Sequence, residues 1–329
     1  MTIALREIRQ GQAFAHVARR INVALVVFLL FYVVIGLLQP NYFEPAGAMN
    51  FLRRAAPLAI LAAGQIFVLV SGGFDLSVGS LVTLTVVGGS MLTANDPGNT
   101  WWAIAVLYAI GLLVGLINGA VVAYLRTPSI IATLGTLLSV NGVAMMWSGG
   151  SPRGYLPDNF RMFGRFVFHD VPVVKIFPVA IIVLVTVCAI AQWCLHGTVF
   201  GRRVFAIGDN ARAALLAGVA VGSVRIAVFV ISSLAAVTAG ILLGGFGGVS
   251  VDVGVGLELQ AIAACVVGGV QLMGGRGTLV GAVAGALTLT ALFTLLTLLG
   301  WPQPLKETAQ GVILIIAVAF GAWRRQRTG

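Results

Sequence analysis

Charged residues are scarce in this sequence of 329 residues. Only 9% of the residues are charged, whereas about a quarter are charged in a typical soluble domain, and 59% are hydrophobic. The mean hydropathy is +1.03. A soluble globular domain is therefore excluded, and we expect lipid to surround most of the chain.

Lysine is nearly absent: the sequence contains only Lys175 and Lys306. Neither stands in a Gly-x-x-x-x-Gly-Lys-Ser/Thr pattern, and the glycine-rich segment GGRG at 274–277 has no lysine. Since that lysine reaches the nucleotide phosphates in a phosphate-binding loop, we predict that the chain does not hydrolyse ATP by this route.

Histidine and cysteine are also rare, with three of each. They are His16, His169 and His196, and Cys188, Cys194 and Cys265. The histidines fall at predicted membrane boundaries or outside them, with no His-Glu-x-x-His or carboxylate cluster beside them, so we predict neither a metal site nor hydrolysis within the membrane. The cysteines lie in or at the ends of apolar runs without metal-ligand spacing, and we interpret them as packing residues.

What the sequence has instead is ten charge-free stretches between consecutive charged residues. They are 21–43, 55–74, 76–95, 97–125, 127–152, 176–201, 226–251, 259–275, 277–305 and 308–323. Eight of them have room for the roughly 20 residues that cross a bilayer core as a helix, and 259–275 and 308–323 lie at or just below the lower limit. We predict an all-α polytopic membrane protein with about ten transmembrane helices.

The placement of the basic residues predicts the orientation. With ten spans and the amino terminus inside, thirteen of the 20 arginines and lysines fall in cytoplasmic segments and seven in outer ones. The positive-inside rule then places both termini in the cytoplasm. This placement also explains the net charge of +10 without a nucleic-acid partner. The domains that follow are a cytoplasmic segment 1–20, one transmembrane domain 21–323 and a basic cytoplasmic tail 324–329.

Three segments are too long or too polar to be simple connections, and one of them is the glycine-rich outer loop 248–256, which contains Asp252. The outer loop 149–174 contains three prolines, several aromatic residues and mixed charge, so we expect it to be structured. The largest cytoplasmic loop is 197–224. In it Asn210 can cap a short helix that begins near Ala211, and Gly218 can end that helix in a left-handed conformation.

Glycine is abundant, with 42 residues, and many lie inside the apolar runs. Gly111, Gly115 and Gly119 are spaced by four, which lets the backbones of two membrane helices approach closely, and we interpret them as packing residues. A weak internal repeat is also visible, because LVSGGFDLSVGSLV at 69–82 resembles VVGGVQLMGGRGTLV at 266–280. Each is an apolar helix, a glycine pair, a short polar turn and then Gly-Ser/Thr-Leu-Val, which hints at a duplicated architecture.

An internal energy source is not apparent. Transporters driven by protons keep an ionisable group near the bilayer centre, and here only Asp75 and Glu258 come close. Asp75 lies in a turn between two predicted spans on the cytoplasmic side, where it can instead cap the next helix. We therefore expect a partner to supply the energy.

Four segments together resemble the permeases of ribose-type ATP-binding-cassette sugar importers. They are GGFDLSVGS at 72–80, TLGTLLSVNGVAMMWSGGSP at 133–152, GRRVFAIGDNARAALLAGV at 201–219 and GVGLELQAIAACVVGGVQLMGGRGTLVGA at 254–282. The resemblance runs from about residue 50 to residue 320 in the family's order. One departure is Phe74, where family members often carry Ile, and it is a conservative apolar change.

The resemblance implies a set of partners. Family permeases lie in the bacterial inner membrane, pair as homo- or heterodimers around a central path, and receive a simple sugar from a periplasmic binding protein. A separate cytoplasmic ATPase uses ATP and Mg, and this chain binds no cofactor itself. The loop 201–219 is similar to the family's coupling segment, whose short helix docks in a groove of the ATPase.

The resemblance and the residue types together give four sets of candidate residues. For ATPase coupling they are Gly208, Asn210, Arg212, Ala213, Ala214 and Gly218. In the motif turns they are Gly72, Gly73, Asp75, Ser77, Gly79, Gly274, Gly275, Arg276 and Gly277. For the translocation path they are Asn118, Thr136, Ser139, Asn141, Glu258 and Gln260. For docking of the binding protein they are Arg153, Asp158, Arg161 and Arg165.

Each set has an alternative interpretation. The polar residues of the path set can instead bond neighbouring helices, and the charges of the docking set can simply be solvated. The cargo can be a nucleoside, a branched-chain amino acid or a signalling furanone. A self-sufficient facilitator or channel predicts flux through this chain alone, and a membrane enzyme is disfavoured because no catalytic constellation is present.

Overall fold

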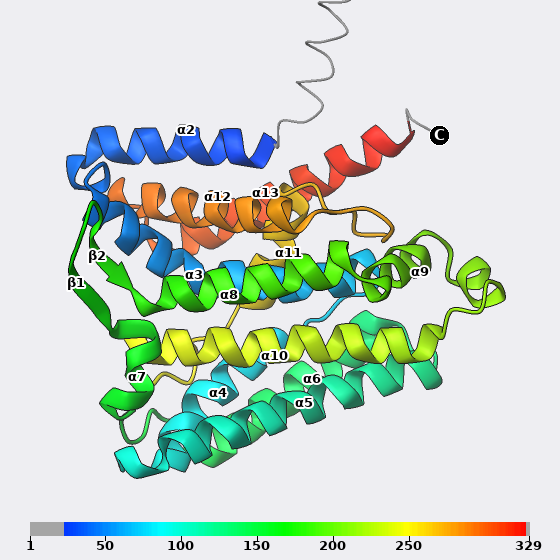
Figure 1. Cartoon of the computed structure of the whole chain (residues 1–329), viewed down its shortest axis with the longest axis horizontal. Helices are drawn as coiled ribbons and strands as arrows, with labels where there is room; N and C mark the ends of the chain where they lie inside the picture. Colours follow the sequence, from blue (N-terminus) through cyan, green and yellow to red (C-terminus); the bar gives the residue numbers. More distant parts are fainter. Residues whose placement is uncertain (1–22, 327–329) are drawn as a thin grey trace, which may run out of the picture.

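The computed structural model describes residues 23–326, with side chains except at 314 and 316–326 (Figure 1). The predicted segment 1–20 and residues 327–329 of the predicted tail lie outside the described residues. The helices and strands, in chain order, are α2 (Val23–Leu38), η1 (Pro40–Tyr42), α3 (Pro45–Val70), α4 (Val78–Thr93), η2 (Pro97–Asn99), α5 (Thr100–Tyr124), α6 (Ser129–Ser148), α7 (Asp158–Arg165), β1 (Val167–Val171), β2 (Lys175–Pro178), α8 (Val179–Gln192), η3 (Trp193–Gly197), α9 (Val199–Leu216), α10 (Val221–Gly247), α11 (Leu257–Val267), α12 (Leu279–Leu298) and α13 (Gln303–Gln326).

Each charge-free stretch contains all or most of one of the helices α2–α6, α8 and α10–α13, and α3, α10, α11 and α13 begin before their stretches. Six helical segments of the described chain are long and apolar enough to cross a membrane: Pro45–Val70, Pro97–Tyr124, Ser129–Ser148, Val179–Gly197, Val221–Gly247 and Leu279–Leu298. Helices α2, α4 and α11 are apolar but shorter. The prediction of an all-α polytopic membrane protein is thus confirmed, whereas the count of ten spans and the orientation stay predictions.

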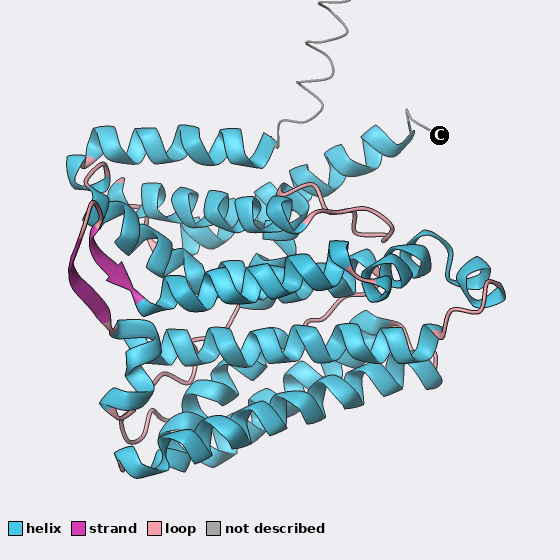
Figure 2. Cartoon of the chain, viewed as in Figure 1, coloured by secondary structure: helices cyan, strands magenta, loops and turns pink. Residues whose placement is uncertain are grey.

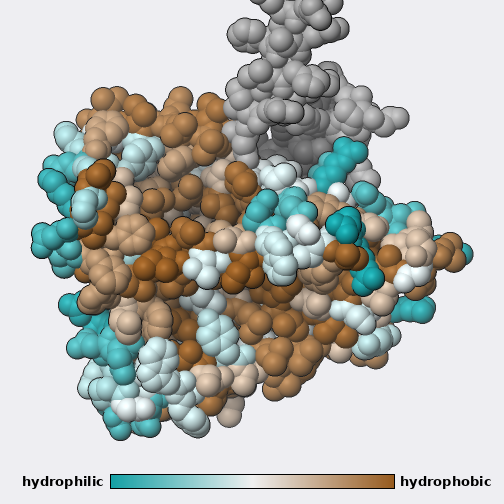
Figure 3. Space-filling model, viewed as in Figure 1, coloured by the Kyte–Doolittle hydropathy of each residue, from teal (hydrophilic) through white to brown (hydrophobic). Residues whose placement is uncertain are grey.

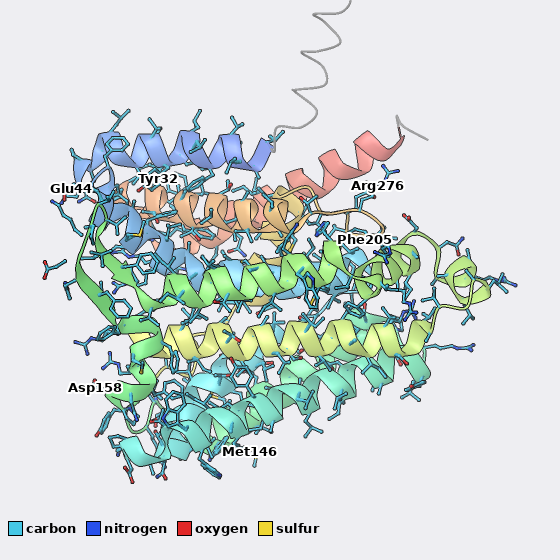
Figure 4. The ribbon with its side chains drawn as sticks, in the orientation of Figure 1. Tyr32, Glu44, Met146, Asp158, Phe205 and Arg276 are labelled. Atoms are coloured by element: carbon cyan, nitrogen blue, oxygen red, sulfur yellow. The ribbon has the colours of Figure 1, made fainter. Side chains whose placement is uncertain are left out.

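The bundle has two distinct ends (Figure 1). One, the hairpin end, holds η1, α7, β1 and β2. The other, the α9 end, holds α9, the first described residue of α2 and the last of α13. Figure 3 shows hydrophilic residues gathered toward the two ends of the visible face and hydrophobic residues along the helices between them. In Figure 4, Glu44 and Asp158 lie at the hairpin end, and Phe205 and Arg276 lie at the α9 end.

Helix α3 lies at the centre of the packing. All of its last sixteen residues are buried, and it packs against α8, α10, α11 and α12. Helices α5 and α10 also pack closely, and the predicted glycine row lies in their contact. A Cβ atom added at Gly115 would lie 2.7 Å from the Val230 Cα, and one at Gly119 would lie 2.5 Å from the Ile226 Cα. The interpretation of this row as a packing surface is confirmed.

The segment 149–174 is structured, as predicted, but it contributes a feature that the sequence reasoning missed. Strands β1 and β2 pair antiparallel, with Val167 opposite Pro178 and a bulge before Val171 (Figure 2). Together with α7 this hairpin covers one end of an otherwise helical bundle.

The long loop at 197–224 is also more ordered than expected. The prediction placed a single short helix from Ala211, whereas α9 begins at Val199, where the Thr198 hydroxyl accepts a hydrogen bond from the Gly201 N–H at 3.2 Å. Asn210 has φ −159° and ψ 100°, so α9 is two helices joined at a kink. The first of them was missed because a threonine cap followed by mixed residues is a weak signal.

Candidate functional site

The short helix after the kink in α9 is capped at both ends. At its start, Asn210 Oδ1 accepts hydrogen bonds from the backbone N–H groups of Arg212 and Ala213, both at 3.0 Å. At its end, Gly218 has φ +82°. The Gly218 N–H donates to the Leu215 carbonyl at 3.0 Å, and the Val219 N–H donates to the Ala214 carbonyl at 3.0 Å. These are the bonds of an asparagine N-cap and a Schellman C-cap, so both predicted helix ends are confirmed.

The exposed side of this short helix is apolar at its tip. Leu215 is 60% exposed and Leu216 is 84% exposed, and Figure 1 shows the helix standing out at the α9 end. Arg212 and Ala213 are exposed as well, whereas Ala214 is only 5% exposed and faces its own chain. Sequence reasoning missed the two leucines, although two adjacent leucines in a loop of mixed polarity were a usable signal.

The first part of α9 contacts both motif turns at one point, which we name the glycine junction and define as Gly72, Gly208, Gly274 and Gly275. The Gly275 N–H donates to the Val70 carbonyl at 2.9 Å. A Cβ atom added at Gly208 would collide with both of those groups. One added at Gly274 would lie 2.9 Å from the Gly208 Cα and 3.0 Å from the Gly72 nitrogen.

Glycine is required at the junction for a second reason. Gly72, Gly274 and Gly275 have φ values of +85°, +88° and +79°, in the region that side-chain-bearing residues rarely adopt. The backbone of α9 therefore rests directly on the two turns, with no side chain between them.

The turn before α4 is bound into the protein interior through Asp75. Asp75 Oδ1 accepts from the Ser77 backbone N–H at 3.0 Å and from the Ser77 hydroxyl at 2.6 Å. The amide of Gln65, in the orientation that satisfies both of its ends, donates to the Asp75 carbonyl at 3.3 Å and accepts from the Asp75 N–H at 3.2 Å. All three residues are buried. Asp75 thus closes the turn that leads into α4. It does not cap the helix as predicted, because the N-cap is Ser77 and no side chain makes a cap bond there.

Two candidate path residues extend this network. Asn118 of α5 donates from Nδ2 to Ser77 Oγ at 2.9 Å, and its Oδ1 accepts from the Thr136 hydroxyl of α6 at 2.5 Å. Ser129, at the start of α6, accepts at Oγ from the Phe74 N–H at 2.9 Å. Asn118 is only 1% exposed. For Asn118 and Thr136 the structure therefore supports the alternative interpretation, in which they bond neighbouring helices.

The other candidate path residues lie elsewhere. Ser139 is exposed on α6 and donates to the Gly135 carbonyl of its own helix at 2.9 Å, and Asn141 is partly exposed on the same helix. On α11, the Glu258 carboxylate occupies the space that a Cβ atom at Gly79 would need, and Gln260 lines a cavity. The six candidates therefore do not form one continuous lining within a single chain.

The candidate docking residues lie in the loop after α6 and on α7. Arg153, Asp158 and Arg165 are exposed there. Arg161 is half-buried, and its Nε donates to the Gly245 carbonyl at the end of α10 at 3.1 Å. Arg161 therefore fixes α7 to the bundle, and the other three side chains stay available at the hairpin end.

Residues 47–318 match the family described as branched-chain amino acid transport system / permease component. The chain belongs to this permease family. The resemblance inferred from the four sequence segments, to sugar-importer permeases of the ATP-binding-cassette type, is confirmed.

Curated relatives cover nearly the whole permease. The autoinducer 2 import system permease protein LsrC of Klebsiella pneumoniae is 36% identical over 309 residues, which are 94% of this chain and 88% of that protein. The ribose import permease protein RbsC of Bacillus subtilis is 35% identical over 310 residues, or 93% of each chain. No solved structure matches the chain.

In this permease, three of the four segments that carried the resemblance meet at the glycine junction. They are 72–80, 201–219 and 254–282. The fourth, 133–152, joins the first because the Thr133 hydroxyl donates to the Phe74 carbonyl at 3.3 Å and because Asn118 bridges Thr136 and Ser77. Motifs far apart in the sequence are therefore parts of one structural unit, in which α9 contacts the turns that begin α4 and α12.

Proposed function

We propose that this chain is the membrane-spanning subunit of an importer driven by a separate cytoplasmic ATPase, and that it carries a small polyhydroxylated molecule such as a monosaccharide across a bacterial inner membrane. The observation that carries this proposal is the glycine junction. It connects a protruding, capped helix with exposed leucines to two turns of the membrane bundle. The partner ATPase, and not this chain, binds ATP and Mg²⁺.

The ATPase docks on the short helix between Asn210 and Gly218. Both ends of this helix are already hydrogen-bonded within the chain, so little conformational entropy is lost on docking. Leu215 and Leu216 offer apolar area at the tip, and burying an exposed leucine contributes roughly 1.5–3 kcal/mol. The adjacent Arg212 adds a charge that an acidic group of the partner can pair with.

A second permease subunit completes the translocation path along α6. Only 17% of the apolar stretch of α6 is buried within this chain. Ser139 and Asn141 are on this helix. A polar cargo passing these side chains needs protein on its other side, because lipid cannot satisfy its hydrogen bonds. A binding protein delivers that cargo at the hairpin end, where Arg153, Asp158 and Arg165 are exposed.

The names of the relatives support a small polar cargo. Curated relatives are named for import of ribose and of autoinducer 2. The family description names branched-chain amino acids, so leucine belongs in any test of cargo. Uptake of radiolabelled ribose, with unlabelled leucine as competitor, separates the two classes in proteoliposomes that hold the permease, its ATPase and its binding protein.

The test of coupling is a pair of variants at exposed apolar positions. We expect the Leu215→Asp, Leu216→Asp double variant to lose the ATPase on co-purification from membranes, because charge replaces the apolar docking area. Val255→Asp is the control, since Val255 is also well exposed but lies in the loop before α11, and it should retain the ATPase. Unchanged ATPase recovery with the double variant would show that docking occurs elsewhere. Uptake by the permease alone would show that the chain is a facilitator and not a subunit of an ATP-driven importer.

A further inference from the structure

A cavity of about 480 Å³ lies inside this single subunit, away from α6. Its lining comes from η1 and the residue before it, the middle of α3, the first turn of α11, and the C-terminal parts of α10 and α12, so it lies in the half of the bundle nearer the hairpin end. The volume is within the range of about 300–1,000 Å³ typical of small-molecule sites. Gln260, one of the six candidate path residues, lines it.

One wall of the cavity is a row of three threonines on α12. Thr290, Thr294 and Thr297 are spaced by four and three residues, so they share a helix face. Each donates its hydroxyl proton to the carbonyl four residues earlier, at 2.9, 2.8 and 2.6 Å respectively. What these hydroxyls offer a ligand is therefore lone pairs, so this wall accepts hydrogen bonds. Thr297 already accepts one, from Lys306 Nζ at 2.9 Å.

Hydrogen-bond donors come from Arg54, Gln39 and Gln260, which also line the cavity. The guanidinium donates only, and the two amides both donate and accept. Within residues 23–326, no hydrogen bond or ion pair fixes these three side chains. The rest of the lining is apolar: the rings of Tyr42 and Phe293 add flat surface, and Pro57, Leu58, Leu243, Leu257 and Leu298 add aliphatic surface.

This set of groups selects the class of ligand. A hydroxyl group both donates and accepts, so a molecule with several hydroxyls can satisfy the threonine wall and the Arg54 side together. A carboxylate only accepts and would meet the threonine lone pairs, as would most of the oxygens of a phosphate. An ammonium only donates and would meet Arg54. Leucine carries one group of each kind, but its apolar side chain leaves the remaining threonine hydroxyls and the amides of Gln39 and Gln260 without partners. Aromatic faces suit the C–H side of a sugar ring better than a charged group.

We propose that this cavity is a binding site for a neutral polyhydroxylated molecule within one permease subunit, occupied by cargo on the outer side before it passes between the subunits. The inference rests on the proposed function for the class of cargo and for the orientation. It adds a site formed by α3, α11 and α12 to a path that α6 and a second subunit otherwise form.

Thiol labelling in the assembled importer tests the site directly. Cys188 and Cys194 are replaced by alanine, and Cys265 is kept because it is fully buried. Thr294→Cys then places a thiol in the cavity, and Gln192→Cys places one at an exposed position at the end of α8 as the control. The probes added before a maleimide reagent are ribose, inorganic phosphate and leucine, each in turn.

Ribose at ten times its half-protective concentration should slow labelling of Thr294→Cys about tenfold by mass action. Phosphate and leucine should leave the rate unchanged, and so should ribose at Gln192→Cys. Absence of protection by ribose at Thr294→Cys, or protection there by phosphate or leucine instead, would overturn the proposal.

A transport variant separates this inference from the proposed function. Gln260→Leu removes the amide at similar size, and we expect the KM for ribose uptake to rise about tenfold, the effect of losing roughly 1.4 kcal/mol of binding, while the ATPase still co-purifies. Gln192→Leu, at an exposed position at the end of α8, is the control. Normal uptake by Gln260→Leu would overturn the proposed site but not the proposed importer. If the unchanged complex showed no ATP-driven uptake, the importer proposal itself would be overturned.

Discussion

The two turns that meet α9 share a sequence pattern but are held in different ways. The turn 71–77, between α3 and α4, is fixed by side chains of three helices: Gln65, Asn118 and Ser129. The turn 268–278, between α11 and α12, is held mostly by its own backbone. Its Gln271 N–H donates to the Arg276 carbonyl at 2.9 Å, and Met273 is 70% exposed.

This difference shows that a repeated pattern predicts where a turn forms but not how firmly it is held. A glycine pair followed by Gly-Ser/Thr-Leu-Val produces a helix, a turn and a helix in both places. Burial of polar side chains around the first turn then makes it a fixed point, because each lost bond there leaves a buried group unsatisfied. The second turn has no such bonds, so we expect it to be the side that moves when α9 moves.

The largest effect should come from filling the point where both turns touch α9. Gly208→Ala adds a methyl group against the Val70 carbonyl and the Gly275 nitrogen. Backbone atoms cannot rotate away, and overpacking costs about 1–3 kcal/mol. We expect ATP-driven uptake to fall about tenfold or more while the ATPase still binds. Gly222→Ala is the control, because its Cβ would meet Tyr124 Cε1 at an ordinary 3.5 Å. Equal uptake by both variants would contradict a role for the junction.

A smaller effect is expected from loosening the fixed turn alone. Asp75→Ala removes the acceptor of two hydrogen bonds from Ser77, and buried donors left without partners cost about 1–3 kcal/mol each. Asp75→Asn keeps an oxygen at the same place. Thermal unfolding in detergent should show a clearly lower Tm for the alanine variant and a Tm near that of the unchanged protein for the asparagine variant. A similar Tm for all three proteins would mean that the network does not hold the turn.

The smallest effect is expected from the other turn. Arg276 is exposed, so Arg276→Ala should change the free energy of unfolding by less than about 0.5 kcal/mol. The same thermal unfolding experiment compares it with Asp75→Ala. If Arg276→Ala lowered the Tm as much as Asp75→Ala, the two turns would be equally fixed and the contrast between them would be lost.

Local features of this permease were predictable from the sequence. Apolar runs produced helices because a lipid-facing backbone must satisfy its own hydrogen bonds. Asn210 and Gly218 ended a helix as expected, because a cap depends only on residues a few positions away. The glycine row on α5 followed from its spacing alone.

Features that depend on distant residues were not predictable. The bond between Asn118 and Ser77 joins positions 41 residues apart, and Asn118 appeared equally suited to a translocation path. The junction of Gly208 with Gly274 needs the fold itself to bring the chain together. The β1–β2 hairpin was missed because a few alternating residues around Pro172 carry little signal in a chain where most apolar runs are helices.

The kink in α9 has a mechanical consequence. Because Asn210 is extended and helices lie on both sides of it, α9 consists of two stiff rods joined at one residue. The outer rod ends in Leu216, and the inner rod rests on the glycine junction through Gly208. A force applied to the tip therefore reaches the turns as a torque about the single pivot at Asn210. A flexible loop of the same length would not transmit that force.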